Sequence, residues 1–192
     1  MQTYFYDQEG QKHGYNCAVN EVEWPSSLTK IAFDNNFNQK LDGVKFPDSL
    51  EVIRFNNEFN QPIDNVEWPV NLRSILFGDN FNQSFDNVKW PDSLVKIRMG
   101  EKTKFSKSLE NAAWPKHLET FIFSGDFNQP LSNIKFPESL KTLGFFGDFN
   151  QSLDNVNFPK SLKELCVAGF NQPIDKVSFP ESLENFASIT FN

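Results

Sequence analysis

An aromatic residue followed by proline recurs eight times along the chain, at a nearly constant interval. The successive prolines are 22, 22, 22, 24, 22, 22 and 21 residues apart. A fixed period of this kind is typical of a solenoid, in which each repeat is one structural unit that stacks on its neighbours. The prolines that define the period are Pro25, Pro47, Pro69, Pro91, Pro115, Pro137, Pro159 and Pro180.

The residues that follow each proline predict one short strand. In the first copy, Ile31 and Phe33 alternate with Ala32, so the two large apolar side chains share one face. Because one such strand cannot bury its apolar face alone, we expect the copies to stack in parallel around a continuous core. The rest of each copy holds Pro, Asn and Asp and is too short for a regular helix, which leaves extended chain or a single 3₁₀ turn.

These observations predict a mainly β fold, a right-handed parallel β solenoid of eight turns of about 22 residues with almost no helix. Residues 22–192 are expected to form the solenoid, with the eighth copy incomplete. Residues 1–21 carry Tyr and Phe on both sides of Asp7-Gln8-Glu9-Gly10, which is a hairpin signal. We therefore expect residues 1–21 to form an N-terminal cap.

A Phe-Asn-Gln triplet follows the strand in most copies. The Phe residues are expected inside the solenoid and help to explain why the chain holds 22 of them. An inward-facing Asn could pair with backbone groups of adjacent turns, which would otherwise be buried unpaired at about 1–3 kcal/mol each. Phe105-Ser106-Lys107 interrupts the pattern in a longer turn, which predicts a local bulge. The expected structural ladder consists of Asn38, Asn60, Asn82, Asn128, Asn150 and Asn171.

The repeat resembles the FNIP-repeat family, a Phe-rich branch of the leucine-rich-repeat-like solenoids. Residues 77–94 (FGDNFNQSFDNVKWPDSL) and 121–140 (FIFSGDFNQPLSNIKFPESL) carry the resemblance, which covers roughly residues 22 to 192. Such repeats are known mostly from slime moulds and from giant viruses of amoebae, where they often follow an F-box. The resemblance implies an intracellular protein-interaction module, here without an F-box because residues 1–21 are too short to hold one.

Composition narrows the class of partner. The net charge of −7 argues against binding to nucleic acid or to an anionic membrane.

The sequence also bears on the compartment of the protein. It contains no stretch of about 18 apolar residues, so no membrane span is predicted. The N-terminus shows no secretory signal, and Cys17 and Cys166 alone cannot make a disulfide framework. We expect a cytoplasmic protein, or one in the host-cell cytoplasm or virion if the chain is viral.

Side chains suited to catalysis or to metal binding are scarce. His13 and His117 are the only histidines. Serines recur two residues after the prolines and are expected to donate hydrogen bonds to backbone groups rather than to act as nucleophiles. A repeated Asp could form a carboxylate column suited to Ca²⁺, but Asx turns are the favoured interpretation because Glu110 and Ser132 interrupt it. We predict no enzyme activity, no metal site and no cofactor. The carboxylate column considered for Ca²⁺ would consist of Asp42, Asp64, Asp86, Asp154 and Asp175.

The outward-facing strand positions vary from copy to copy, and in the first five copies they hold basic or neutral residues and no acidic ones. Basic and aliphatic side chains on one face suit the recognition of an acidic or mixed protein surface. The alternative is that the lysines only discourage aggregation. The predicted partner-binding residues are Lys30, Arg54, Leu76, Lys96, Arg98 and Ile122.

The eighth copy supports a second hypothesis, a structural or self-assembling protein. This copy stops at Phe191-Asn192 without a polar capping segment, so we expect its strand edge and its aromatic side chains to be open. A second copy of the chain could cover them, and the predicted contacts of this homo-oligomer are Phe186 and Ile189.

Overall fold

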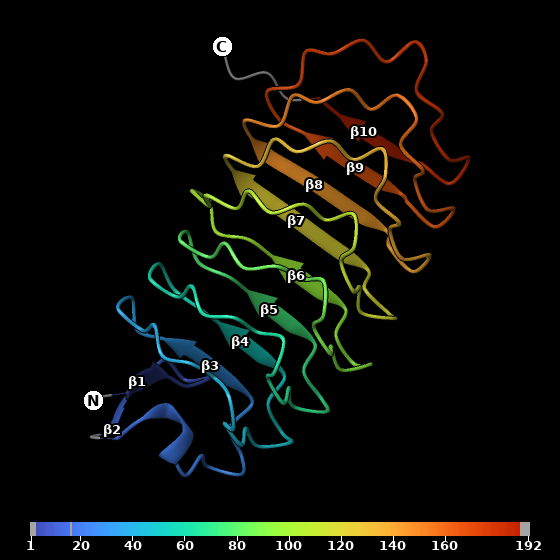
Figure 1. Ribbon diagram of the computed structural model, residues 1–192. Coiled ribbons are helices and arrows are strands. Elements are labelled where there is room, and N and C mark those ends of the chain that lie inside the picture. Colours follow the sequence, from blue (N-terminus) through green and yellow to red (C-terminus); the bar gives the residue numbers. More distant parts are fainter. Residues whose placement is uncertain (1–2, 16, 189–192) are drawn as a thin grey trace.

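One sheet of ten strands organises the computed structural model, which describes residues 3–15 and 17–188 (Figure 1). The strand order is β10-β9-β8-β7-β6-β5-β4-β3-β1-β2, so from β3 onward each repeat adds one strand beside the previous one. The strands are β1 (Thr3–Tyr6), β2 (Lys12–Tyr15), β3 (Lys30–Phe33), β4 (Val52–Arg54), β5 (Ser74–Leu76), β6 (Lys96–Arg98), β7 (Thr120–Gly125), β8 (Thr142–Gly147), β9 (Glu164–Val167) and β10 (Asn185–Ala187).

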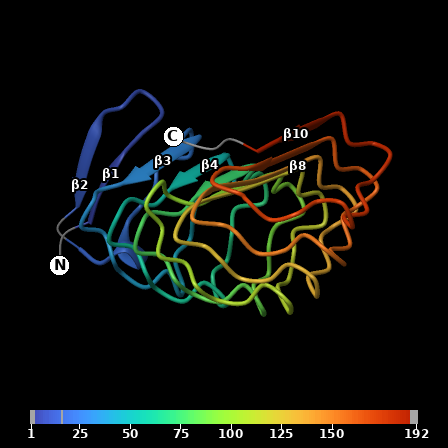
Figure 2. The ribbon, with the colours of Figure 1, turned by 90° about the horizontal axis from the view of Figure 1, so that it is seen from above.

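The predicted solenoid is confirmed. Strands β3 to β10 pair in parallel, and about seven turns connect these eight strands. Within the described residues the helix content is one 3₁₀ turn, η1 (Val19–Glu21). Figure 2 shows the strands on one side of the coil and the connecting segments on the opposite side.

Columns of phenylalanine fill the space between the sheet and the connecting segments. Phe55, which directly follows β4, stacks on Phe59 of the same copy at 4.0 Å between ring centroids and on Phe77 of the next copy at 5.7 Å. Phe59 stacks in turn on Phe81 at 6.0 Å, and these four rings are almost completely buried. Each such burial stabilises the fold by about 1.5–3 kcal/mol, which explains the excess of Phe in the composition.

An antiparallel hairpin lies against the first strand of the solenoid. Strand β1 pairs with β2 on one side and with β3 on the other, both antiparallel. Phe5 points into the core, is fully buried and stacks on His13 and Tyr15 of β2 at 5.0 and 5.8 Å. The hairpin therefore covers core side chains at the end of the solenoid where β3 lies.

The amides of the Phe-Asn-Gln triplets lie at the surface, so their predicted inward orientation is wrong. Each Asn follows an inward Phe in extended chain and therefore points outward; Asn38 is exposed, and Asn60 and Asn82 are half-buried. Their oxygens still join successive copies: Asn38 Oδ1 accepts the backbone N–H of Asn60 at 3.0 Å, and Asn60 Oδ1 accepts that of Asn82 at 2.9 Å. Gln83 Nε2 also donates to Asn60 Oδ1, at 2.8 Å, which gives the Gln of the triplet a role.

The same contact continues into the later copies. Ser106 replaces Asn in the fourth copy, and its backbone N–H donates to Asn82 Oδ1 at 3.0 Å. Asn128 accepts the N–H of Asn150, which accepts that of Asn171, both at 3.0 Å. In the part of the chain that the structure describes, no such bond joins Ser106 to Asn128, so the ladder has two segments.

The repeated serines donate to the backbone, as predicted. Ser49 Oγ donates to the carbonyl of Leu28 in the previous copy at 2.8 Å, and Ser93 Oγ donates to that of Leu72 at 2.7 Å. Ser161 and Ser182 make the same bond at 2.7 Å. The hydroxyl therefore links the turn before one strand to the preceding copy.

The longer fourth turn changes the strands that follow it. The extra residues lie after β6, within 100–104, and leave the register of β6 with β7 unbroken. Gly125 has a φ of 74°, and a Cβ there would lie 2.4 Å from the carbonyl oxygen of Thr103. Gly147 has a φ of 150°, and a Cβ there would lie 2.1 Å from the carbonyl oxygen of Gly125. Because these glycines permit close backbone approach, β7 and β8 extend to six residues, whereas β6 has three.

Candidate protein-binding face

The outward side chains of β3 to β8 form one continuous surface, here called the strand face. Strand register aligns them in two rows, of which the second carries Arg54, Leu76, Arg98 and Ile122 on successive strands. In the first row, Lys30 on β3 and Lys96 on β6 are three strands apart. All six residues predicted to bind a partner therefore lie on this face. The first row is Lys30, Val52, Ser74, Lys96, Thr120 and Thr142, and the second is Ala32, Arg54, Leu76, Arg98, Ile122 and Gly144.

Four cations of the strand face have no carboxylate partner. Within the described residues, no ion pair engages Lys30, Arg54, Lys96 or Arg98, and neither row contains Asp or Glu before β9. Arg54 and Arg98 are exposed, and the two lysines are half-buried. The face is therefore locally basic in a chain whose net charge is −7.

Carboxylates border the strand face instead of lying on it. Glu119 directly precedes β7 and pairs with Lys141 at 2.6 Å. Glu164 begins β9 and accepts a hydrogen bond from Thr142 Oγ1 at 3.1 Å. Exposed Glu51 precedes β4. On the strand face, the positive charge that has no ion-pair partner in the described residues is therefore confined to the strands from β3 to β6.

The strand face also includes an exposed aromatic ring that the sequence analysis did not predict. Phe146 on β8 points outward and is 37% exposed. Its ring covers Gly144: a Cβ at position 144 would lie 2.8 Å from Phe146 Cε2 and 3.5 Å from Ile122 Cγ1. Gly144 is buried for this reason although it lies in an outward row. The sequence signal for an outward Phe146 was its place directly after the inward Phe145. That signal was weak because most other strands end before the equivalent position.

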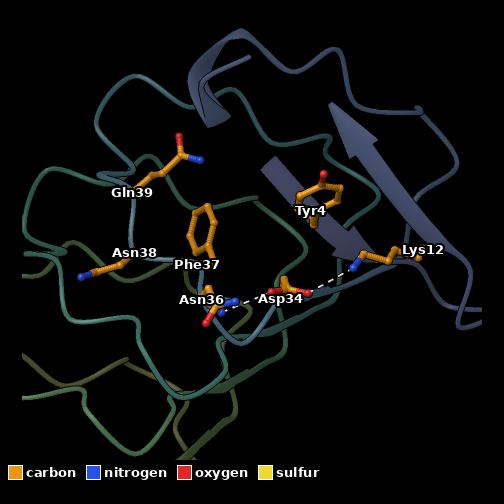
Figure 3. A pocket seen from close by; sticks show the side chains of 7 residues that line it. All are labelled: Tyr4, Lys12, Asp34, Asn36, Phe37, Asn38 and Gln39. Carbon is orange, nitrogen blue, oxygen red and sulfur yellow. Dashed lines mark hydrogen bonds and ion pairs between the residues drawn. The ribbon is translucent and has the colours of Figure 1, made fainter. Parts of the chain in front are cut away.

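The hairpin extends the strand face past β3 with aromatic and basic side chains. Tyr6 pairs with Ala32, and Lys12 Nζ lies 4.6 Å from the ring centroid of Tyr4 and 5.7 Å from that of Tyr6. Lys12 also donates to Asp34 Oδ2 at 3.4 Å, a contact that raises the pKa of the lysine (Figure 3). Both tyrosines and Lys12 thus lie beside the predicted binding residues.

A hollow of about 580 Å³ adjoins the Lys12–Asp34 pair (Figure 3). Its wall is mixed: one aromatic ring from the hairpin, one from the first turn, one ion pair and several amides. Because the cation is already paired, the hollow offers no free charge to a small ligand. Its lining residues are Tyr4, Lys12, Asp34, Asn36, Phe37, Asn38 and Gln39.

The last repeat is less well covered than the others. Strand β10 pairs with β9 and with no other strand in the described part of the chain. Phe179, Leu183 and Phe186 are only partly buried, whereas Leu165, which pairs with Phe186, is fully buried. Ile189, the other predicted contact of a homo-oligomer, lies outside the described residues.

The hairpin also holds one pair of titratable side chains. His13 Nε2 and Asp7 Oδ2 lie 2.8 Å apart in the hairpin, where the histidine ring also stacks on Phe5. Over residues 3–15 and 17–188, no three His, Cys, Asp or Glu side chains gather to hold a metal ion. No helix in those ranges has the length and the apolar character that a membrane crossing requires.

Comparisons with known proteins agree on the repeat. The profile described as "FNIP Repeat" matches residues 15–58, 59–102, 105–148 and 149–186. No curated protein gives a significant match. Among solved structures, the chain is similar to the giant-virus protein CroV588, whose crystal structure is described as a novel circular LRR protein structure. The two are 31% identical with a TM-score of 0.52 over 88% of this chain, which spans 31% of the length of CroV588.

Proposed function

The chain belongs to the FNIP repeat family, and on that basis we propose that it is a non-enzymatic protein-binding module whose strand face contacts the partner. The observation that carries this proposal is a set of four cations without a carboxylate partner in the described residues, which lie among the half-buried Leu76 and Ile122 and the exposed Phe146. Arginine and aromatic side chains are enriched at the energetically dominant positions of protein interfaces, and this face supplies Arg54, Arg98, Tyr6 and Phe146.

A charge-reversal variant tests the proposal. Arg54→Glu combined with Arg98→Glu should abolish capture of the partner proteins that the unmodified chain retains, as measured by quantitative mass spectrometry after affinity purification. The melting temperature should hardly change, because exposed charges without partners contribute little to folding.

A matched variant controls for net charge. Lys89→Glu combined with Lys135→Glu makes the same change in charge at exposed positions of the connecting segments. This control should keep the partners. If the folded Arg54/Arg98 variant retains them as well as the control does, the strand face is not the binding site.

A second candidate is self-assembly through the last repeat. The one-sided pairing of β10 and the partial exposure of Phe186 favour it, because an open strand edge with apolar side chains invites pairing with another chain. Phe186→Lys should then convert an oligomer to a monomer in light scattering coupled to size-exclusion chromatography. A chain that is monomeric before mutation contradicts this candidate and leaves the recognition proposal intact.

A further inference from the structure

The second row of the strand face alternates charged and apolar side chains. Successive strands present Arg54, Leu76, Arg98 and Ile122, and the ring of Phe146 then occupies the place above Gly144. Building on the proposed function, we infer that this row binds an acidic segment of a partner protein that carries one large apolar side chain. The apolar side chain sits on Ile122 and Phe146, and two carboxylates reach Arg98 and Arg54.

Charge complementarity determines the sign of the partner. The lysines that border the face are neutralised: Lys12 by Asp34, Lys141 by Glu119 and, beyond β8, Lys163 by Glu184. Arg54 and Arg98 have no such neighbour in the described part of the chain. Carboxylates of a partner can pair with both guanidinium groups, whereas a basic segment would be repelled.

Strand spacing determines the distances within the segment. Arg54, Arg98 and the Phe146 ring belong to β4, β6 and β8, so each is two strands from the next. Two strand intervals span about 10 Å. A polyproline II segment advances about 9 Å in three residues and brings every third side chain back to the same side. The inferred segment is therefore extended, with its apolar residue and two acidic residues three positions apart.

The aromatic ring of Phe146 packs directly over Gly144. Because a Cβ at position 144 would lie only 2.8 Å from Phe146 Cε2, any larger residue there must displace the ring. This contact permits two independent perturbations of one patch. Phe146→Ser removes the ring, and Gly144→Val keeps the phenylalanine but moves it.

Selection from a phage library of random dodecapeptides on the full-length chain tests the inference. We expect enriched peptides to carry Asp or Glu twice and Leu, Ile, Phe or Trp once, at intervals of three. Fluorescence anisotropy with the most enriched peptide should show affinity lowered about tenfold or more in Phe146→Ser and in Gly144→Val, with melting temperatures close to that of the unmodified chain. Affinity should also fall as salt is raised.

The negative outcomes are separable. Enriched peptides that need Arg54 and Arg98 but lack acidic residues, or that bind Phe146→Ser and Gly144→Val normally, overturn the inferred segment and leave the proposed face standing. If no selected peptide depends on Arg54 and Arg98, the face itself is refuted together with the segment.

Discussion

Replacing Asn60 with alanine removes one acceptor that serves two donors of the next copy. Asn60 Oδ1 accepts the backbone N–H of Asn82 at 2.9 Å and Nε2 of Gln83 at 2.8 Å, and both contacts are partly buried. A net contribution of about 0.5–1.5 kcal/mol for each bond gives an expected loss of about 1–3 kcal/mol in the free energy of unfolding. Gln83 keeps its bond to the Asn60 carbonyl at 3.0 Å, so the lower half of that range is expected.

Chemical denaturation followed by tryptophan fluorescence measures this loss, and two variants control it. Asn60→Asp keeps an oxygen acceptor at the same place and should lose clearly less stability than Asn60→Ala. Asn87→Ala removes an exposed amide to which no hydrogen bond is assigned in the described chain and should change stability by less than about 0.5 kcal/mol. Equal losses in Asn60→Ala and Asn87→Ala, or in Asn60→Ala and Asn60→Asp, would refute the acceptor role.

Three further predictions concern backbone and titratable groups. Gly147→Ala should lower the melting temperature strongly, because φ is 150° and a Cβ would lie 2.1 Å from the Gly125 carbonyl oxygen. Burial raises the pKa of the Cys166 thiol, so this cysteine should react with maleimide more slowly than free cysteine at pH 7, and its rate should increase with pH. A rate equal to that of free cysteine would contradict this. The hydrogen bond from His13 lowers the pKa of the Asp7 carboxyl. The ionised carboxylate therefore stabilises the hairpin at pH values above the ordinary pKa of 3.8, and this stabilisation is lost as pH falls through the lowered pKa. Amide exchange in the hairpin should show this loss, and Asp7→Asn should abolish it.

The repeat, the strand positions and the apolar core follow from the order of the residues. Ile31 and Phe33 alternate locally, and the same pattern returns about every 22 residues, so burial of the apolar face requires stacking whatever the details of the turns. The parallel sheet with Ile31 opposite Ile53 is the outcome of that requirement. The serine bonds were also predictable, because a hydroxyl in a turn has few partners other than the backbone.

The direction of the amides and the full extent of the strand face depend on contacts between copies. Asn60 points outward because the inward place is taken by Phe59, and its acceptor is satisfied by a copy that lies 22 residues further along the chain. Phe146 reaches the strand face because β8 is long, and β8 is long because Gly147 can approach the backbone of Gly125. Arg98 is unpaired because strand register places Leu76 and Ile122, not carboxylates, beside it. Alternation within one copy is a local property, whereas pairing and length are determined by the neighbours that each copy meets when the chain coils.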